Sequence, residues 1–188
     1  MDKFLDYWNE HGQLIKNSDI DLAILHLLKD LLGVVDRNSR VYTAGNGGSA
    51  ATAEHFAADL NLTLLRKNKR ISAMCFSSQL STASALANDI GYDKVFSFQA
   101  RNHLQDKDVV ILFTASGNSE NILQLIHEAK TKNAKIHVFV GFDGGRVLDV
   151  EGINLIFVEC ANGEYGKIEN VHASICHFIV DKLNAERV

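Results

Sequence analysis

The sequence predicts a single α/β domain in which helices flank a mostly parallel five-stranded sheet, preceded by a pair of N-terminal helices. Two observations predict this fold. From residue 40 onward, five short apolar runs alternate with helical segments, which is the pattern of βαβ units. The chain has 188 residues, 46% of them hydrophobic, so it can bury one core but is too short for two domains of ordinary size.

The N-terminal region, residues 1–39, predicts two helices. Apolar side chains from Ile20 to Leu32 recur at intervals of three and four residues, and Ser18 is a suitable N-cap for this helix. An amphipathic segment over residues 1–15 precedes it. Two helices ahead of the first strand are more than one sheet needs, so we expect residues 1–39 to pack against a partner subunit.

The rest of the chain, residues 40–188, is expected to carry the sheet and the functional site. The predicted strands are residues 41–44, 71–76, 109–113, 136–140 and 153–158, and a last helix is predicted over residues 167–183. In open parallel sheets, ligands bind beyond the carboxyl ends of the strands. The turns that leave the strands are therefore the places to look for chemistry.

Composition excludes several classes of protein. A net charge of −4 argues against a dedicated nucleic-acid binder, although backbone donors can still hold a phosphate locally. No stretch approaches the run of about 18 apolar residues that a membrane span requires, so we expect no membrane partner. The three cysteines form no Cys-x-x-Cys pair, which is typical of a reducing compartment and predicts a cytoplasmic protein.

The turn after the first strand is rich in glycine. It reads Gly45-Asn46-Gly47-Gly48-Ser49-Ala50 and leads into a helix, whose first N–H groups can bind an anion. The turn also satisfies the dinucleotide pattern G-x-G-x-x-A, but no acidic residue follows the second strand to hold a ribose. A tight turn without any ligand remains the alternative.

The turn after the third strand is rich in hydroxyl groups. Thr114, Ser116 and Ser119 surround a glycine at the start of a helix, which suits a phosphate group. Ser119 is equally suitable as an N-cap for the helix that begins at Glu120. Taken together, the two turns predict a small phosphorylated ligand.

A third group of residues has the chemistry of a metal site or of proton transfer. His55 and Asp59 are four residues apart and share one face of a helix, although such pairs are often simple surface pairs. The last helix adds Glu169, His172 and His177. Since Glu169 and His177 are separated by about 12 Å along a continuous helix, one metal ion would bind both only across a subunit boundary or if the helix started later.

Several motifs in order resemble the phosphoheptose isomerases, a family of SIS-domain proteins. The resemblance covers residues 40–183. It rests on residues 45–50 with 55–59, then 88–92, 116–119 and 143–145. It implies that residues 40–188 form an SIS sugar-phosphate-binding domain. It also implies a homotetramer with intersubunit sites that converts sedoheptulose 7-phosphate to glycero-manno-heptose 7-phosphate for lipopolysaccharide or other surface polysaccharide.

The resemblance also implies roles for individual residues. The expected substrate contacts are Asn46, Gly47, Gly48, Ser49, Asn88, Asp89, Thr114, Ser116, Asn118 and Ser119. The expected ligands of one zinc ion per site are His55, Asp59, Glu169 and His177. Asp59 and His177 are also the expected acid and base in an aldose–ketose interconversion through an enediol, and they would alternate between ligand and proton-transfer roles.

Three positions depart from the family pattern. Asp59 stands where the family has a longer glutamate, Glu169 where it has a neutral glutamine, and Thr63 where it often has an arginine. Two alternatives follow. One is an isomerase for a different phosphosugar, and the other is a noncatalytic SIS scaffold resembling the replication-initiator-associating protein. The presence of both His55 and His177 favours the enzyme.

Overall fold

The computed structural model describes residues 3–63 and 70–185, and it confirms the predicted α/β architecture. A single parallel sheet has the strand order β2-β1-β3-β4-β5. Its strands are β1 (Val41–Gly45), β2 (Ala73–Cys75), β3 (Val109–Thr114), β4 (Lys135–Val140) and β5 (Asn154–Phe157). The α-helices are α1 (Phe4–Lys16), α2 (Asp21–Arg37), α3 (Gly47–Leu62), α4 (Leu80–Asp89), α5 (Val95–His103), α6 (Glu120–Thr131) and α7 (Tyr165–Ala185). Short 3₁₀ turns are η2 (Phe76–Ser78), η3 (Tyr92–Lys94) and η4 (Gly145–Asp149).

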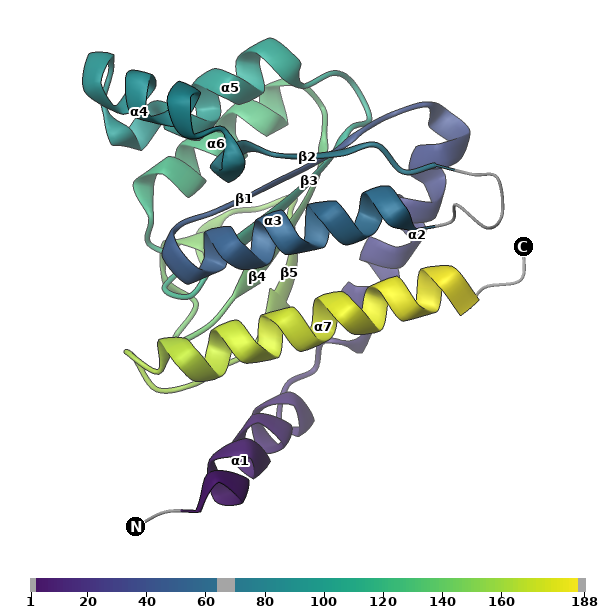
Figure 1. The fold of residues 1–188 in the computed structure, drawn as a ribbon, viewed down its shortest axis with the longest axis vertical. Helices are drawn as coiled ribbons and strands as arrows, with labels where there is room; N and C mark the ends of the chain where they lie inside the picture. Colours follow the sequence, from purple (N-terminus) through teal and green to yellow (C-terminus); the bar gives the residue numbers. More distant parts are fainter. Residues whose placement is uncertain (1–2, 64–69, 186–188) are drawn as a thin grey trace.

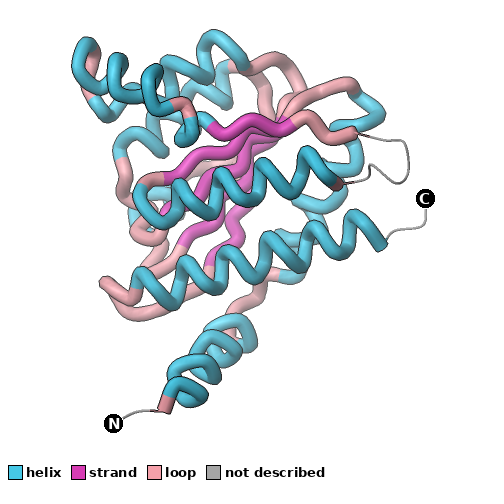
Figure 2. The backbone as a smooth tube through the Cα atoms, viewed as in Figure 1, coloured by secondary structure: helices cyan, strands magenta, loops and turns pink. Residues whose placement is uncertain are grey.

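Helices cover both faces of the sheet. One face packs against α2, α3 and α7, and the other packs against α5 and α6 (Figures 1 and 2). Alternate residues of β3 supply the two cores, with Ile111 and Phe113 in one and Val110 and Leu112 in the other. Because both sides of the strand are buried, its sequence is a continuous apolar run rather than an alternating one.

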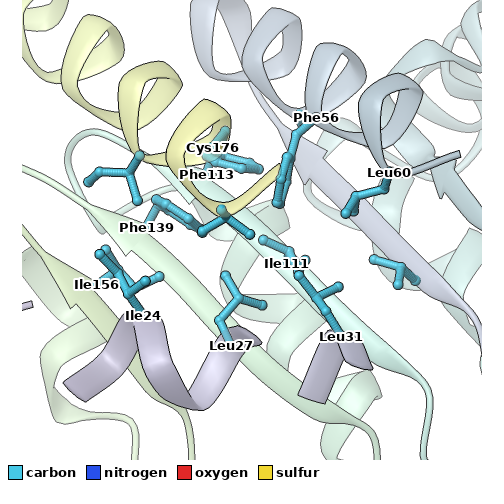
Figure 3. Close-up of a cluster of buried hydrophobic side chains, with 14 of the residues drawn as sticks. Ile24, Leu27, Leu31, Phe56, Leu60, Ile111, Phe113, Phe139, Ile156 and Cys176 are labelled. Atoms are coloured by element: carbon cyan, nitrogen blue, oxygen red, sulfur yellow. The ribbon is translucent and has the colours of Figure 1, made fainter. Parts of the chain in front are cut away.

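The core under α2, α3 and α7 is built around aromatic rings (Figure 3). Phe113 stacks on Phe139 with ring centroids 4.6 Å apart, and Phe56 of α3 meets Phe113 edge-on at 6.2 Å. Leu27 and Leu31 of α2 are fully buried in the same cluster. The core therefore fixes α3 and α7 side by side above the sheet.

Helix α1 stands away from the body of the domain and contacts it mainly through α7 (Figure 1). Its apolar side chains are largely uncovered, with Phe4 78% exposed, Leu5 63% and Trp8 51%. In an isolated chain this exposure is unfavourable, since burial of a large apolar side chain is worth about 2 kcal/mol.

Some predicted boundaries differ from those observed. Ser18 is not the N-cap of α2. Its hydroxyl donates to the carbonyl of Leu14 at the end of α1, and Ile20 occupies the cap position. The second strand is shorter than residues 71–76 because Phe76 already begins η2. The start of the predicted first helix, at residues 1 and 2, lies outside the described residues, and no helix among those described has the length and apolarity to cross a bilayer.

Strand order determines where a ligand can enter. The chain leaves β1 toward β2 on one side, whereas β3 lies on its other side. The connection that follows β1 runs to β2, and the connection that follows β3 runs to β4 on the opposite side of the sheet. Because these two connections diverge, a crevice opens at the carboxyl ends of β1 and β3.

Candidate active site

A cleft of about 270 Å³ opens at the carboxyl ends of β1 and β3. It lies between the N-terminal ends of α3 and α6. Its lining comprises Asn46, Gly47, Gly48, Ser49, Phe113, Thr114, Ala115, Ser116, Ser119, Tyr165 and Glu169. The structure thus brings together the glycine-rich turn and the hydroxyl-rich turn.

The glycine-rich turn exposes the first N–H groups of α3. Gly47 has φ +54°, a left-handed conformation that favours glycine, and Asn46 occupies the N-cap position with extended backbone. The Asn46 side chain makes no capping hydrogen bond to α3. The helix end therefore presents unfilled donors and a partial positive charge to the cleft.

The hydroxyl-rich turn is held in shape by internal contacts. Thr114 Oγ1 accepts from the Gly117 amide at 3.1 Å. Gly117 has φ +64°, and a Cβ atom there would collide with the Gly144 carbonyl. Asn118 donates to the Ser116 carbonyl and accepts from the Arg146 amide, so it shapes the loop and does not line the cleft.

Ser119 lies at the N-cap position of α6 but makes no side-chain capping bond. Ser119 lines the same cleft as Thr114 and Ser116. Two helix ends without side-chain caps and three hydroxyl groups therefore converge, which is an arrangement suited to an anionic ligand.

Helices α3 and α7 bring together His55, Asp59 and His177. Asp59 Oδ2 lies 3.5 Å from His55 Nε2 and 3.7 Å from His177 Nδ1. The two imidazole rings meet edge-on with centroids 5.0 Å apart. One ligand atom from each residue lies within 4.8 Å of the others, and two nitrogens with one oxygen form a donor set that zinc accepts.

Glu169 lies apart from this group. It lines the cleft, and a Cβ atom at Gly48 would collide with its carboxylate. Because α7 is continuous from Tyr165 to Ala185, Glu169 and His177 are about 12 Å apart along the helix axis. The four expected zinc ligands are therefore not assembled by one chain.

Asn88 and Asp89 also lie outside the cleft lining. They are exposed at the end of α4, where the Asn88 side chain donates to Asp89 Oδ1 at 2.9 Å. Thr63, where the family often has arginine, is buried and closes α3 by donating its hydroxyl to the Asp59 carbonyl at 2.8 Å. No cationic side chain stands at that position.

Two polar residues near the cleft were not predicted. Tyr92 and Asn121 both hydrogen-bond to the side chain of Asn46. Tyr92 belongs to the motif over residues 88–92, but the sequence does not predict its bond to Asn46. Asn121 gives no signal of its own, since an asparagine in the first turn of a helix is common.

Charged and titratable groups around the site respond to burial and to neighbours. Burial lowers the pKa of His172 to about 4, and a backbone hydrogen bond to Val140 opposes the shift. Arg146 bonds to the Glu120 carboxylate at the start of α6 and lowers its pKa. Burial also raises the pKa of the Cys176 thiol, which keeps it protonated beneath α3.

Sequence comparison with known proteins identifies the family of this chain. The SIS domain family matches residues 6–141. Phosphoheptose isomerase from Helicobacter pylori (strain P12) is 33% identical over 157 residues, which cover 84% of this chain and 79% of that protein. The chain belongs to the phosphoheptose isomerase family.

Solved structures agree on the fold. A phosphoheptose isomerase from Francisella tularensis superposes with a TM-score of 0.87 at 23% identity and covers 96% of both chains. Phosphoheptose isomerase GmhA from Neisseria gonorrhoeae gives a TM-score of 0.85 at 24% identity over 97% of both chains. Family membership confirms the prediction of a single SIS domain and of an enzyme in the sugar-phosphate isomerase class.

Proposed function

We propose that this phosphoheptose isomerase family member converts sedoheptulose 7-phosphate to glycero-manno-heptose 7-phosphate. The product would supply heptose for lipopolysaccharide or another surface polysaccharide. The observation that carries the proposal is the cleft, in which two helix ends without side-chain caps and three hydroxyl groups face one another. The Helicobacter pylori relative is named a phosphoheptose isomerase, which supports a heptose phosphate over other phosphosugars.

The cleft binds the anionic end of the sugar. Thr114, Ser116 and Ser119 donate their hydroxyl groups to the phosphate, and the N-terminus of α6 adds backbone N–H groups. On the opposite wall, Asn46 and Ser49 contact the sugar at the start of α3. Gly47, where a Cβ atom would meet nothing within 4 Å, lets the ligand approach the backbone closely, and the lack of a side chain at Gly48 leaves room for the Glu169 carboxylate.

Asp59 and His177 carry out the proton transfer. One of them removes a proton from C1 of the ketose while the C2 oxygen gains a proton, which gives the enediol. The proton is then returned to carbon at C2 while the C1 hydroxyl gives up its proton, which forms the aldehyde of the aldose. His55, Asp59 and His177 would hold a zinc ion, which when bound polarises the carbonyl and stabilises negative charge on its oxygen. His55 orients the Asp59 carboxylate from one side, and His177 orients it from the other.

The active site is shared between subunits of a homo-oligomer, which we propose to be a tetramer. Within one chain, His177 lies about 12 Å along α7 from Glu169 in the cleft, and Asn88 and Asp89 lie outside it. Neighbouring subunits would supply the missing groups. The N-terminal region over residues 1–39 would form the contacts, since Phe4 and other apolar side chains of α1 are uncovered.

Partners and location follow from the same chemistry. The substrate is a phosphorylated sugar, and we propose no nucleic-acid or membrane partner. Cys75, Cys160 and Cys176 are free thiols, which agrees with the reducing cytoplasm as the site of the reaction.

The test separates chemistry from binding. Asp59→Asn and His177→Ala should each abolish turnover of sedoheptulose 7-phosphate, because each removes a group that exchanges protons, while calorimetry should still detect sugar-phosphate binding. His127→Ala, at an exposed position on α6, is the matched control and should keep full activity. Metal chelation should lower turnover as well.

Two results would overturn the proposal. Retained turnover in either site variant would remove the mechanism. Faster conversion of fructose 6-phosphate or ribulose 5-phosphate than of the heptulose phosphate would assign the enzyme to a different sugar.

A further inference from the structure

We propose that Tyr92 and Asn121 are positioning residues that hold the Asn46 side chain off the end of α3 and present it to the ligand as a hydrogen-bond donor only. The inference rests on the proposed function, because it concerns how the same cleft recognises the sugar phosphate. It is carried by three hydrogen bonds that join segments far apart in the sequence.

The Asn46 amide is engaged on both of its polar atoms. Asn46 and Asn121 exchange two hydrogen bonds of 2.9 Å, each donating to the oxygen of the other. The hydroxyl of Tyr92, at the start of η3, donates to the Asn46 oxygen at 2.7 Å. The amide thus lies between α6 and η3.

The bond from Tyr92 agrees with the orientation of the Asn46 amide. A separation of 2.7 Å is typical of an O–H···O bond, whereas N–H···O bonds are usually longer. The Asn46 oxygen accepts from both Tyr92 and Asn121, so its two acceptor sites are both occupied. One Asn46 N–H is donated to Asn121, and the second N–H is the polar group left for a ligand. It suits an acceptor such as a carbonyl or phosphate oxygen.

The same bonds explain why α3 lacks a side-chain cap. Asparagine is among the preferred N-cap residues because its side-chain oxygen accepts from the N–H groups of the second or third helical residue. In α3 those residues are Gly48 and Ser49, both of which line the cleft. With the Asn46 oxygen held by Tyr92 and Asn121, these N–H groups remain available for an anionic ligand.

Burial makes Asn121 an effective anchor. The residue is 3% exposed, so water does not readily replace its hydrogen bonds to Asn46. Tyr92, by contrast, is exposed in the single chain, and its hydroxyl keeps lone pairs that a sugar hydroxyl can approach. Asn121 determines the position of the amide, and Tyr92 determines its orientation.

The test uses changes that alter hydrogen bonding and leave volume nearly constant. Tyr92→Phe removes the hydroxyl, and Asn121→Asp replaces its amide donor with a carboxylate oxygen. Each should raise KM for sedoheptulose 7-phosphate about tenfold, as expected for loss of one or two hydrogen bonds, with kcat changed by less than about twofold. In an Asn46→Ala background, measured at high salt to screen the charge that Asn121→Asp adds, neither change should raise KM further.

Two matched controls lie away from the cleft. Tyr42→Phe removes a tyrosine hydroxyl that donates to the His103 carbonyl at 3.1 Å. Asn154→Asp removes amide donors that bond to the Ala23 carbonyl and to His137 Nδ1, both at 2.8 Å. Both controls should lower the midpoint of urea unfolding without changing KM.

A ligand-free measurement separates this inference from the proposed function. The side-chain amide signals of Asn46, assigned in NMR spectra by their loss in Asn46→Ala, should shift in Tyr92→Phe and Asn121→Asp and stay in place in both controls. An enzyme that shows these shifts but does not turn over the heptulose phosphate would overturn the proposed function alone. Unshifted Asn46 signals, unchanged KM, or effects that add to those of Asn46→Ala would overturn the positioning role.

Discussion

Acidification should destabilise the protein through one buried imidazole. His172 on α7 is 1% exposed and packs against Phe139, with ring centroids 5.6 Å apart, and against Phe113. Its Nε2 atom has no hydrogen-bond partner among the described residues. Burial therefore holds the ring neutral and lowers its pKa from 6.5 to about 4.

The size and sign of the effect follow from this shift. The unfolded chain takes up the proton first, so the contribution of neutral His172 to stability is complete above pH 6.5 and is lost as the pH falls toward 4. Between pH 7 and pH 4.5 the linkage amounts to roughly 2 kcal/mol. This is a large share of the stability of an ordinary domain.

His172→Leu provides the comparison. Leucine suits the apolar surroundings, and the Val140 carbonyl keeps its bond from the Val158 amide at 3.0 Å. The free energy of urea unfolding, measured from pH 7 to pH 4.5, should fall by roughly 2 kcal/mol more in the unaltered protein than in His172→Leu. The exposed control His127→Gln should follow the unaltered protein. Parallel losses in His172→Leu and the unaltered protein would refute the reasoning.

Two other changes test the walls of the cleft. Gly117→Ala should lower the free energy of urea unfolding by more than about 2 kcal/mol, because the left-handed backbone and the Gly144 carbonyl both oppose a Cβ atom. Gly12→Ala on α1 is the control. A Cβ atom there meets nothing within 4 Å, so this change should be neutral or slightly stabilising. Equal effects of the two substitutions would contradict this account. Glu169→Gln should tighten the binding of inorganic phosphate several-fold at low salt, because it removes a negative charge from the cleft, and the gain should shrink at high salt. Tighter binding that is independent of salt would exclude a charge effect.

The sequence was sufficient to predict the sheet and the two turns that line the cleft. Runs such as residues 109–113 are apolar throughout because both faces of β3 are buried, and that pattern distinguishes a parallel strand from a solvent-facing one. Once the strands are placed, the general rule for open parallel sheets puts Ser49 and Ser116 at the same edge.

Contacts between side chains far apart in the sequence could not be predicted. Asn121 follows Asn46 by 75 residues, and nothing in either local pattern shows that their amides meet. The same applies to Glu169, whose position over Gly48 depends on how α7 crosses the start of α3. Spacing along one helix predicted the separation of Glu169 and His177, because a helix has a fixed rise per residue.

The structure bears on whether the departures at positions 59 and 169 leave the chemistry intact. Asp59 is one methylene shorter than the glutamate of the family, yet its carboxylate lies within 4 Å of a nitrogen on both His55 and His177. The close packing of α3 against α7 supplies this proximity, so the shorter side chain keeps contact with both partners. Glu169 lies about two turns of α7 before His177, so its negative charge is in the cleft and not beside Asp59. The two substitutions therefore act at different ends of the α3–α7 pair, and we expect the first to alter turnover and the second to alter the binding of the phosphate.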